Sequence, residues 1–162
     1  TCLKPCRSLM QSLPKHSDPT CRDQAWIGYL SGQWHLARQI HDHLTGQQGT
    51  LTGTASFIEN APANMHWHEH GTLSIGTYEG EAWRDYRVIQ ADDGMTRITF
   101  DDGCPFFDLP NSLGRADIDH SCPPDRYIGT ITVLSDNQWQ LDWTIRGPRK
   151  NLTIGTVYTR EP

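Results

Sequence analysis

The sequence of 162 residues contains no hydrophobic run that approaches the roughly 20 residues needed for a membrane-spanning helix. Apolar residues are also scarce overall, at 36%, although six residues are Trp. A chain of this length fits one domain, which buries about two-thirds of the surface that its unfolded form exposes. We therefore expect a single soluble domain whose core depends on aromatic side chains.

Basic residues are few after the first 22 positions, and the net charge of the whole chain is −5. The early basic residues are Lys4, Arg7, Lys15 and Arg22, against the single acid Asp18. Phosphate binding requires a basic surface that releases counterions. The acidic body therefore argues against nucleic acid as a partner, whereas a basic arm could hold a protein partner.

Closely paired cysteines are absent, because none of the five cysteines forms a C-x-x-C pair. This spacing excludes a zinc ribbon and a thioredoxin-type motif, and an odd count does not fit a complete disulfide framework. Cys104 and Cys122 flank one segment of the chain. The sequence leaves open whether they are reduced thiols packed as small apolar groups, a disulfide or a reactive thiol.

The chain begins at Thr1 rather than Met, and its first 20 residues are basic, contain Ser and Pro, and include almost no acid. This composition is typical of what remains after a targeting peptide is removed, and an artificial start would look the same. We expect an extended arm over residues 1–20 and a globular domain over residues 21–162. The location stays open between an organelle lumen and the cytoplasm.

Alternation of apolar and polar residues runs through most of the chain from residue 32 onward, after a short helix with one apolar face near residues 25–30. Turn signals rich in Gly, Asn, Asp or Pro separate the alternating segments. The predicted strands are 32–40, 50–59, 64–75, 81–90, 95–101, 104–109, 127–134, 138–146 and 151–159. Such strands with short connections predict an all-β fold, a single up-and-down antiparallel barrel of about 8–10 strands. Its interior would be just wide enough for one small ligand.

Strand parity predicts which side chains face the interior, because successive residues point to opposite faces. By this rule Glu69 faces inward, where a lone carboxylate is costly to bury. Arg38 is inward by the same rule and is its predicted partner. The other inward residues that we expect to contact a ligand are Phe57, Trp67, Arg84, Tyr86 and Trp143.

His66, His68 and His70 alternate with these inward residues and could be read as a metal site. Residues i and i+4 lie about 13 Å apart on a strand, so His66 and His70 cannot share one ion. We predict a solvated outer face and no metal.

The segment over residues 101–127 concentrates reactive and rigid residue types, and we predict that it forms the rim of a pocket. We expect a strand over residues 104–109, an irregular crossing loop over 110–126, and the start of the next strand at residue 127. Phe106, His120 and Tyr127 are predicted ligand contacts in this segment.

The Gly32-x-Trp34 step after a short helix resembles the lipocalin and calycin barrels, in which that Trp plugs the closed end. A larger set of motifs over residues 25–160 resembles a domain family of unknown function whose members are small calycin-like barrels. The motifs are Gly32-x-Trp34-x-Leu36-x-Arg38, Asp102-Gly-Cys-Pro-Phe106, His120-x-Cys122-x-x-Asp125-x-Tyr127 and Gly147-Pro-Arg-Lys150. The resemblance implies no activity or cofactor. Trp67 stands where members more often have Tyr, and Phe107 where they more often have His, which puts in doubt any mechanism that needs that histidine.

These residues predict binding of a small hydrophobic or amphipathic molecule, with an apolar body and a polar or carboxylate head group, in the barrel interior. A first alternative is an isomerase or cyclase that uses no cofactor, with Glu69, His120 and Asp125 as acid and base groups. A second is an accessory subunit of a larger assembly, in which the polar residues only stabilise the barrel. We predict no cofactor; haem ligation through His120 is a further alternative.

Overall fold

The computed structural model describes residues 25–162, so the predicted arm over residues 1–20 lies outside the described residues. One short helix precedes ten strands. The elements are α1 (Ala25–Leu30), β1 (Gly32–Asp42), β2 (Gln48–Ala61), β3 (Asn64–Ile75), β4 (Tyr78–Gln90), β5 (Thr96–Phe100), β6 (Pro105–Leu109), β7 (Arg115–Cys122), β8 (Asp125–Ser135), β9 (Gln138–Gly147) and β10 (Lys150–Arg160). No helix among the described residues is long and apolar enough to cross a membrane.

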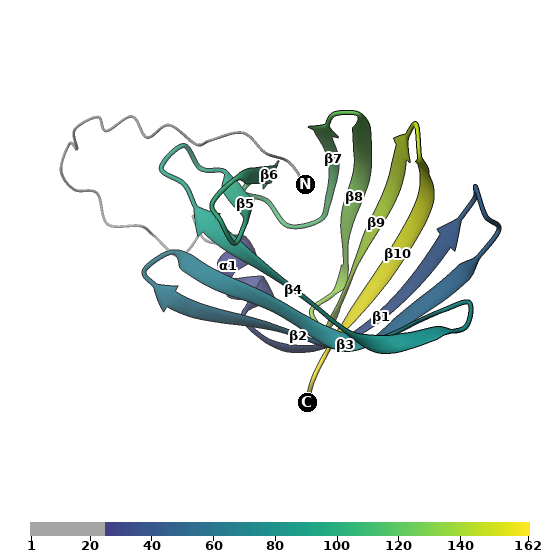
Figure 1. Cartoon of the computed structure of the whole chain (residues 1–162). Coiled ribbons are helices and arrows are strands. Elements are labelled where there is room, and N and C mark those ends of the chain that lie inside the picture. Colours follow the sequence, from purple (N-terminus) through teal and green to yellow (C-terminus); the bar gives the residue numbers. More distant parts are fainter. Residues whose placement is uncertain (1–24) are drawn as a thin grey trace.

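The ten strands form one antiparallel sheet in the order β6-β5-β4-β3-β2-β1-β10-β9-β8-β7. Strands that follow one another in the chain pair with each other, except β6 and β7, and β1 also pairs with β10, so the sheet curls into a nearly closed barrel (Figure 1). The two ends of the sheet are β6 and β7, which meet at a seam without a shared ladder. The predicted all-β, up-and-down barrel with a short N-terminal helix is confirmed.

The predicted crossing loop over residues 110–126 was wrong in its extent, because it contains the strand β7. Ala116 and Ile118 are buried and alternate with exposed acids, which is the period-2 pattern of a strand that has one face on the core. A hairpin joins β7 to β8. The true connection across the seam is the short segment 110–114.

One end of the barrel is closed by α1 and the first residues of β1. Trp26 and Trp34 are completely buried there. The indole nitrogens of both rings donate hydrogen bonds at 2.8 Å to backbone oxygens, Trp26 to Pro110 and Trp34 to Leu30. Trp34 therefore plugs this end of the barrel, as the resemblance of the Gly32-x-Trp34 step implies.

Burial confirms the predicted inward faces of β1 and β3, whereas on β4 Tyr86 is buried and Arg84, on the same face, is exposed. On β1 the residues Trp34, Leu36 and Arg38 are buried, and the residues between them are exposed. On β3 Trp67 and Glu69 are buried, and His68 between them is half-buried. A shift of one residue would have exchanged the two faces of each strand, so this pattern sets which side chains can reach the barrel interior.

The barrel wall is incomplete near the seam. β4 pairs with β5 only from Tyr86 to Gln90, so among the described residues Tyr78–Asp85 carries no strand on the side away from β3. β5 and β6 are only five residues long. The first half of β4 is therefore a sheet edge that borders the barrel interior.

Candidate functional site

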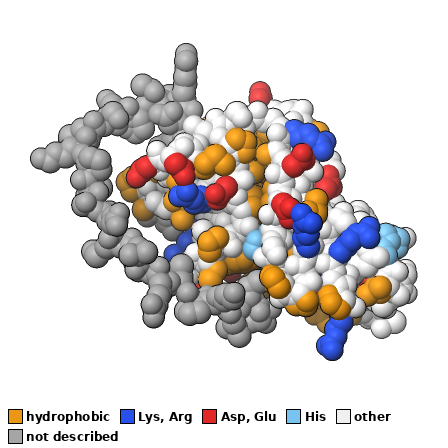
Figure 2. All heavy atoms as spheres, turned by 90° about the horizontal axis from the view of Figure 1, so that it is seen from above, with side chains coloured by type: hydrophobic (Ala, Val, Ile, Leu, Met, Phe, Trp, Pro, Cys, Tyr) orange, Lys and Arg blue, Asp and Glu red, His pale blue; other side chains and the backbone are white. Residues whose placement is uncertain are grey.

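A cavity of about 620 Å³ occupies the barrel interior on the side away from α1. Its lining comprises Arg38, Trp67, Glu69, Arg84, Asp85, Tyr86, Phe100, Asp102, Cys104, Phe106, His120, Cys122, Tyr127, Leu141, Trp143, Ile145, Lys150, Leu152, Ile154 and Tyr158. Small-molecule sites typically measure about 300–1,000 Å³. Figure 2 views the molecule from above the tips of β7 to β10, where charged side chains of both signs lie around hydrophobic ones.

The structure brings nearly all of the predicted ligand contacts to this cavity. The predicted residues in its lining are Arg38, Trp67, Glu69, Arg84, Tyr86, Phe106, His120, Tyr127 and Trp143. The exception is Phe57, which is 1% exposed and lies in the core. Its ring stacks on Trp67 with centroids 5.1 Å apart, so Phe57 supports the lining without forming part of it.

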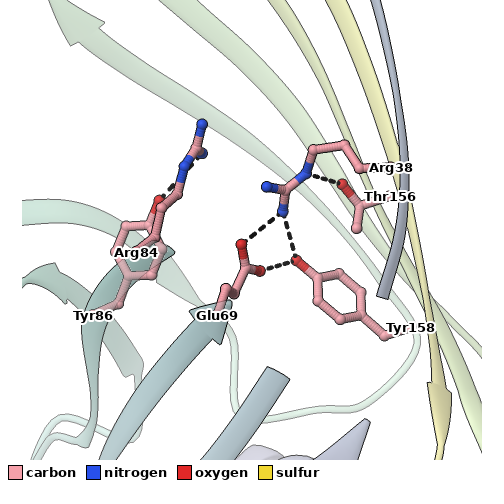
Figure 3. A network of polar contacts seen from close by, with 6 residues as sticks. All are labelled: Arg38, Glu69, Arg84, Tyr86, Thr156 and Tyr158. Atoms are coloured by element: carbon pink, nitrogen blue, oxygen red, sulfur yellow. Dashed lines mark hydrogen bonds and ion pairs between the residues drawn. The ribbon is translucent and has the colours of Figure 1, made fainter. Parts of the chain in front are cut away.

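Arg38 and Glu69 form the predicted ion pair, in which Nη2 donates to Oε2 at 2.8 Å. The other carboxylate oxygen, Oε1, accepts a hydrogen bond from the hydroxyl of Tyr158 at 2.5 Å. Arg38 Nε donates to Thr156 Oγ1 at 2.8 Å, which fixes the plane of the guanidinium (Figure 3). Both oxygens of Glu69 are therefore occupied by groups of the barrel itself.

Burial and charge together fix the protonation of this network. Burial alone would lower the pKa of Arg38, but the neighbouring Tyr158 and Glu69 outweigh it and the net shift is upward. Burial raises the pKa of Tyr158 well above its usual value, and the nearby Glu69 carboxylate raises it further. At neutral pH Arg38 is therefore a cation, and Tyr158 keeps the proton that it donates.

Two guanidinium groups remain available to the cavity. Arg38 Nη1 has no hydrogen-bond partner among the described residues, since the hydrogen bonds of this side chain all use Nε or Nη2. Arg84 lies opposite Glu69 in the register of β3 and β4, but forms no ion pair with any described residue. Its contact is a long hydrogen bond of 3.5 Å from Nη1 to the hydroxyl of Tyr86. Figure 3 shows Arg38 and Arg84 on opposite sides of Glu69.

Aromatic rings form one wall of the cavity. Phe106 lies nearly parallel to Tyr86 and to Trp143, with an interplanar angle of 15° in both cases and centroid distances of 5.7 and 5.3 Å. A register shift in the pairing of β5 with β6 lets the consecutive residues Phe106 and Phe107 both contact Trp143. Phe100 stacks on Phe106 at 4.7 Å and extends the wall.

Two of the residues predicted as acid and base groups, His120 and Asp125, have different partners at the rim of the cavity. Asp125 forms an ion pair with Lys150 at 2.7 Å and is not part of the cavity lining. His120 packs edge-on against Phe106, with centroids 5.1 Å apart, and lies opposite Tyr127 in the strand register. The structure thus pairs Asp125 with Lys150 rather than with His120.

The protonation states of these rim residues differ. Burial lowers the pKa of His120, and a hydrogen bond with the Phe106 backbone opposes this only in part, so the imidazole is neutral at neutral pH. Hydrogen bonds with Asp125 and Tyr127 raise the pKa of Lys150. Lys150 is therefore a paired cation, which disfavours a role as a nucleophile.

The histidines of β3 lie on the outer face, as predicted. His66 Nε2 and His68 Nδ1 both contact Asp85 Oδ1, at 2.9 and 2.7 Å, and the two histidine side chains are about 40% exposed. Among residues 25–162, no group of three or more His, Cys, Asp or Glu is placed to hold a metal ion. The two histidines therefore link β3 to β4 on the outer surface.

Sequence reasoning missed the contribution of β10. Tyr158 and Thr156 complete the buried network, and Leu152 and Ile154 line the cavity. These residues follow one another at every second position, so the parity rule used for the other strands could have placed them on the inner face. Their connection to Glu69 could not be found this way, because it depends on strands far apart in the sequence.

Residues 30–160 match the model of a protein family described as Family of unknown function (DUF6314). The chain belongs to this family. The predicted resemblance to a domain family of unknown function is thereby confirmed at the level of the family. No curated protein matches this DUF6314 member significantly.

Solved structures share the barrel fold with this DUF6314 protein at low sequence identity. The S-type phycobiliprotein lyase CPES from Guillardia theta is 8% identical, with a TM-score of 0.58 over 85% of this chain and 91% of that chain. EF1p2_mFAP2b bound to DFHBI is 16% identical, with a TM-score of 0.49 over 86% of this chain and 99% of that one. The redesigned β-barrel mFAP0, also bound to DFHBI, is 15% identical, with a TM-score of 0.45 over 82% and 99%. The first likeness supports the barrel fold alone.

Proposed function

We propose that this DUF6314 barrel binds a small amphipathic molecule in its cavity. The head group, polar or a carboxylate, contacts Arg38 and Arg84, and the apolar body lies along the aromatic wall of Tyr86, Phe106 and Trp143. The observation that carries the proposal is the pairing of a fixed arginine and an unpaired arginine with an aromatic wall in one cavity of about 620 Å³.

The buried network fits a binding site better than a purely structural lock. Replacing a buried ion pair with well-packed apolar residues is often neutral or stabilising, so such a pair is a poor device for stability alone. If Arg38 and Glu69 only stabilised the barrel, the adjoining cavity and the second arginine would have no role. A binding site uses the cavity to hold the ligand and fixed donors, oriented before the ligand arrives, to contact its head group.

The head-group end offers donors suited to an anion. Arg38 Nη1 is held by the bonds that the other guanidinium nitrogens make to Thr156, Glu69 and Tyr158. Arginine presents its N–H groups in a fixed planar fork that matches a carboxylate, and hydrogen bonds between charged partners are roughly twice as strong as neutral ones. A carboxylate between Arg38 and Arg84 would satisfy both groups.

The acid–base alternative receives less support from the geometry. Glu69 would have to give up hydrogen bonds from Arg38 and Tyr158 before it could accept a proton from a substrate. His120 faces the cavity without a carboxylate partner, since Asp125 is paired with Lys150. Efficient general bases are usually oriented by a second group, and the group that contacts His120 is the Phe106 backbone rather than a carboxylate.

Intrinsic fluorescence tests the binding proposal, because Trp67 and Trp143 line the cavity. Titration with hydrophobic carboxylates or terpenoid-like compounds should quench the emission with saturation. Trp143→Phe should reduce the quenching. The matched control is Trp83→Phe, since Trp83 is 65% exposed on the outer face and should not report on the cavity. Quenching that disappears in the Trp83 variant, or no saturable change with any compound while the fold is intact, would refute the proposal.

A further inference from the structure

The charges of the cavity point to a narrower class of ligand. We propose that the cavity selects molecules that carry a single negative charge, and that Arg84 is the residue that determines this selectivity. The inference rests on the proposed function, because it specifies the head group of a ligand bound at that site.

Most of the charged residues in the cavity lining form ion pairs. Arg38 is neutralised by Glu69 at 2.8 Å, and Lys150 by Asp125 at 2.7 Å. Arg84 has no ion pair with any residue among 25–162, although it belongs to the same lining. Among the arginines and lysines of the lining, within the described part of the chain, Arg84 is therefore the one without an acidic partner.

The two acids nearest to Arg84 in the strands are both paired with other residues. Glu69 lies directly opposite Arg84 on the neighbouring strand, a position in which opposite charges normally attract. However, Arg38 and Tyr158 occupy the two carboxylate oxygens of Glu69 from the other side of the barrel. Asp85, the next residue on β4, contacts His66 and His68 on the outer face instead. Both nearby acids are therefore paired with other residues and do not neutralise Arg84.

The cavity lining does not favour a second negative charge on the ligand. Asp102, a further acid of the lining, would repel it. His120 offers a neutral imidazole at neutral pH, because burial lowers its pKa. A dianion would therefore find no second unpaired cation in the described lining. A neutral ligand would leave Arg84 without a partner.

The position of Arg84 fits this role. It shares the inner face of β4 with Tyr86, two residues further along, and Tyr86 stacks on the aromatic wall. A flat ring against Tyr86 would carry its acidic substituent to the Arg84 guanidinium. Arg84 also lies on the part of β4 that has no strand on its outer edge among the described residues, so a head group reaches it without opening the sheet.

Three probes of similar shape and different charge test the inference: 2-naphthoate, 2-naphthamide and 2,6-naphthalenedicarboxylate, titrated calorimetrically at neutral pH. One charge-assisted contact corresponds to about a tenfold difference in dissociation constant or more. We expect 2-naphthoate to bind at least about tenfold more tightly than the other two.

Variants of two arginines on the same strand locate the effect. Arg84→Gln should weaken 2-naphthoate about tenfold and leave 2-naphthamide unchanged, whereas Arg84→Lys should keep most of the preference. Arg87→Gln is the matched control, because Arg87 is half-exposed and pairs with Asp101 at 3.7 Å. It should bind all three probes as the parent protein does.

The outcomes separate the two proposals. If all three probes bind equally well, or if Arg84→Gln keeps the preference for 2-naphthoate, the cavity binds ligands but the charge selectivity is wrong. If the dianion binds most tightly, the count of unpaired cations is wrong. If none of the probes binds to the folded protein, the proposed function fails, and the inference fails with it.

Discussion

At the scale of single residues, Glu69 determines the chemistry of the cavity. It accepts one hydrogen bond from Arg38 and one from Tyr158, and its side chain is 3% exposed. Because these bonds use both oxygens, Glu69 fixes Arg38 in place and leaves Arg84 unpaired. One buried acid thereby sets the orientation of one cation and the availability of another.

Glu69→Ala should destabilise the barrel by about 3–5 kcal/mol, because it leaves the Arg38 charge buried without a partner. Urea unfolding measures the loss. Glu81→Ala, in the neighbouring strand and 75% exposed, should change stability by less than about 0.5 kcal/mol. Equal stability of the two variants would show that the Arg38–Glu69 pair is not buried as described.

His120 gives the barrel a pH dependence with a definite sign. Its pKa in the folded state lies below the ordinary value of 6.5, since burial disfavours the imidazolium. Over the pH range between these two values the unfolded chain binds more protons, so stability falls as the pH drops through 6.5 toward the folded-state value. His120→Gln should lose less stability than the parent protein between pH 7 and about pH 5. Parallel stability curves for the two proteins, measured by urea unfolding, would contradict this assignment.

At the scale of elements, the seam between β6 and β7 distinguishes this barrel from a fully closed one. The strands β5 and β6 are short, and β7 closes the opposite side through the buried residues Ala116 and Ile118. The wall of the cavity at the seam consists of side chains, chiefly Phe106, rather than of a continuous ladder.

Ile118→Ala should cost about 2–4 kcal/mol of unfolding free energy, because Ile118 is 4% exposed and its loss leaves a void under β7. Ser121→Ala, on the exposed face of the same strand, should change stability by less than about 0.5 kcal/mol. If both substitutions are harmless, residues 115–122 do not form a strand packed on the core.

At the scale of the whole molecule, the fold follows from local patterns in the sequence. The alternation of Trp34, Leu36 and Arg38 predicts both a strand and its inner face, and the structure shows both. β7 was missed because its alternation is brief and lies between proline-containing segments, which favour loops in a local interpretation. The alternation of apolar and polar residues therefore predicts a strand when the strand is long enough to show several alternations.

The candidate site was less accessible to such reasoning. Parity places Arg38 and Glu69 inside, and their pairing follows from the cost of a lone buried carboxylate. Glu69 could pair with Arg38 or with Arg84. It pairs with Arg38, because the Tyr158 hydroxyl forms hydrogen bonds with both Arg38 and Glu69. That competition involves β1, β3, β4 and β10 together, so no local pattern could predict that Arg84 is left unpaired.

A crystal structure of the protein with 2-naphthoate would show where the ligand and its carboxylate lie. We expect the carboxylate within hydrogen-bond distance of Arg84 and of Arg38 Nη1, and the ring against Tyr86, Phe106 or Trp143. A ligand bound on the outer face, or an interior filled by the protein's own side chains, would contradict it.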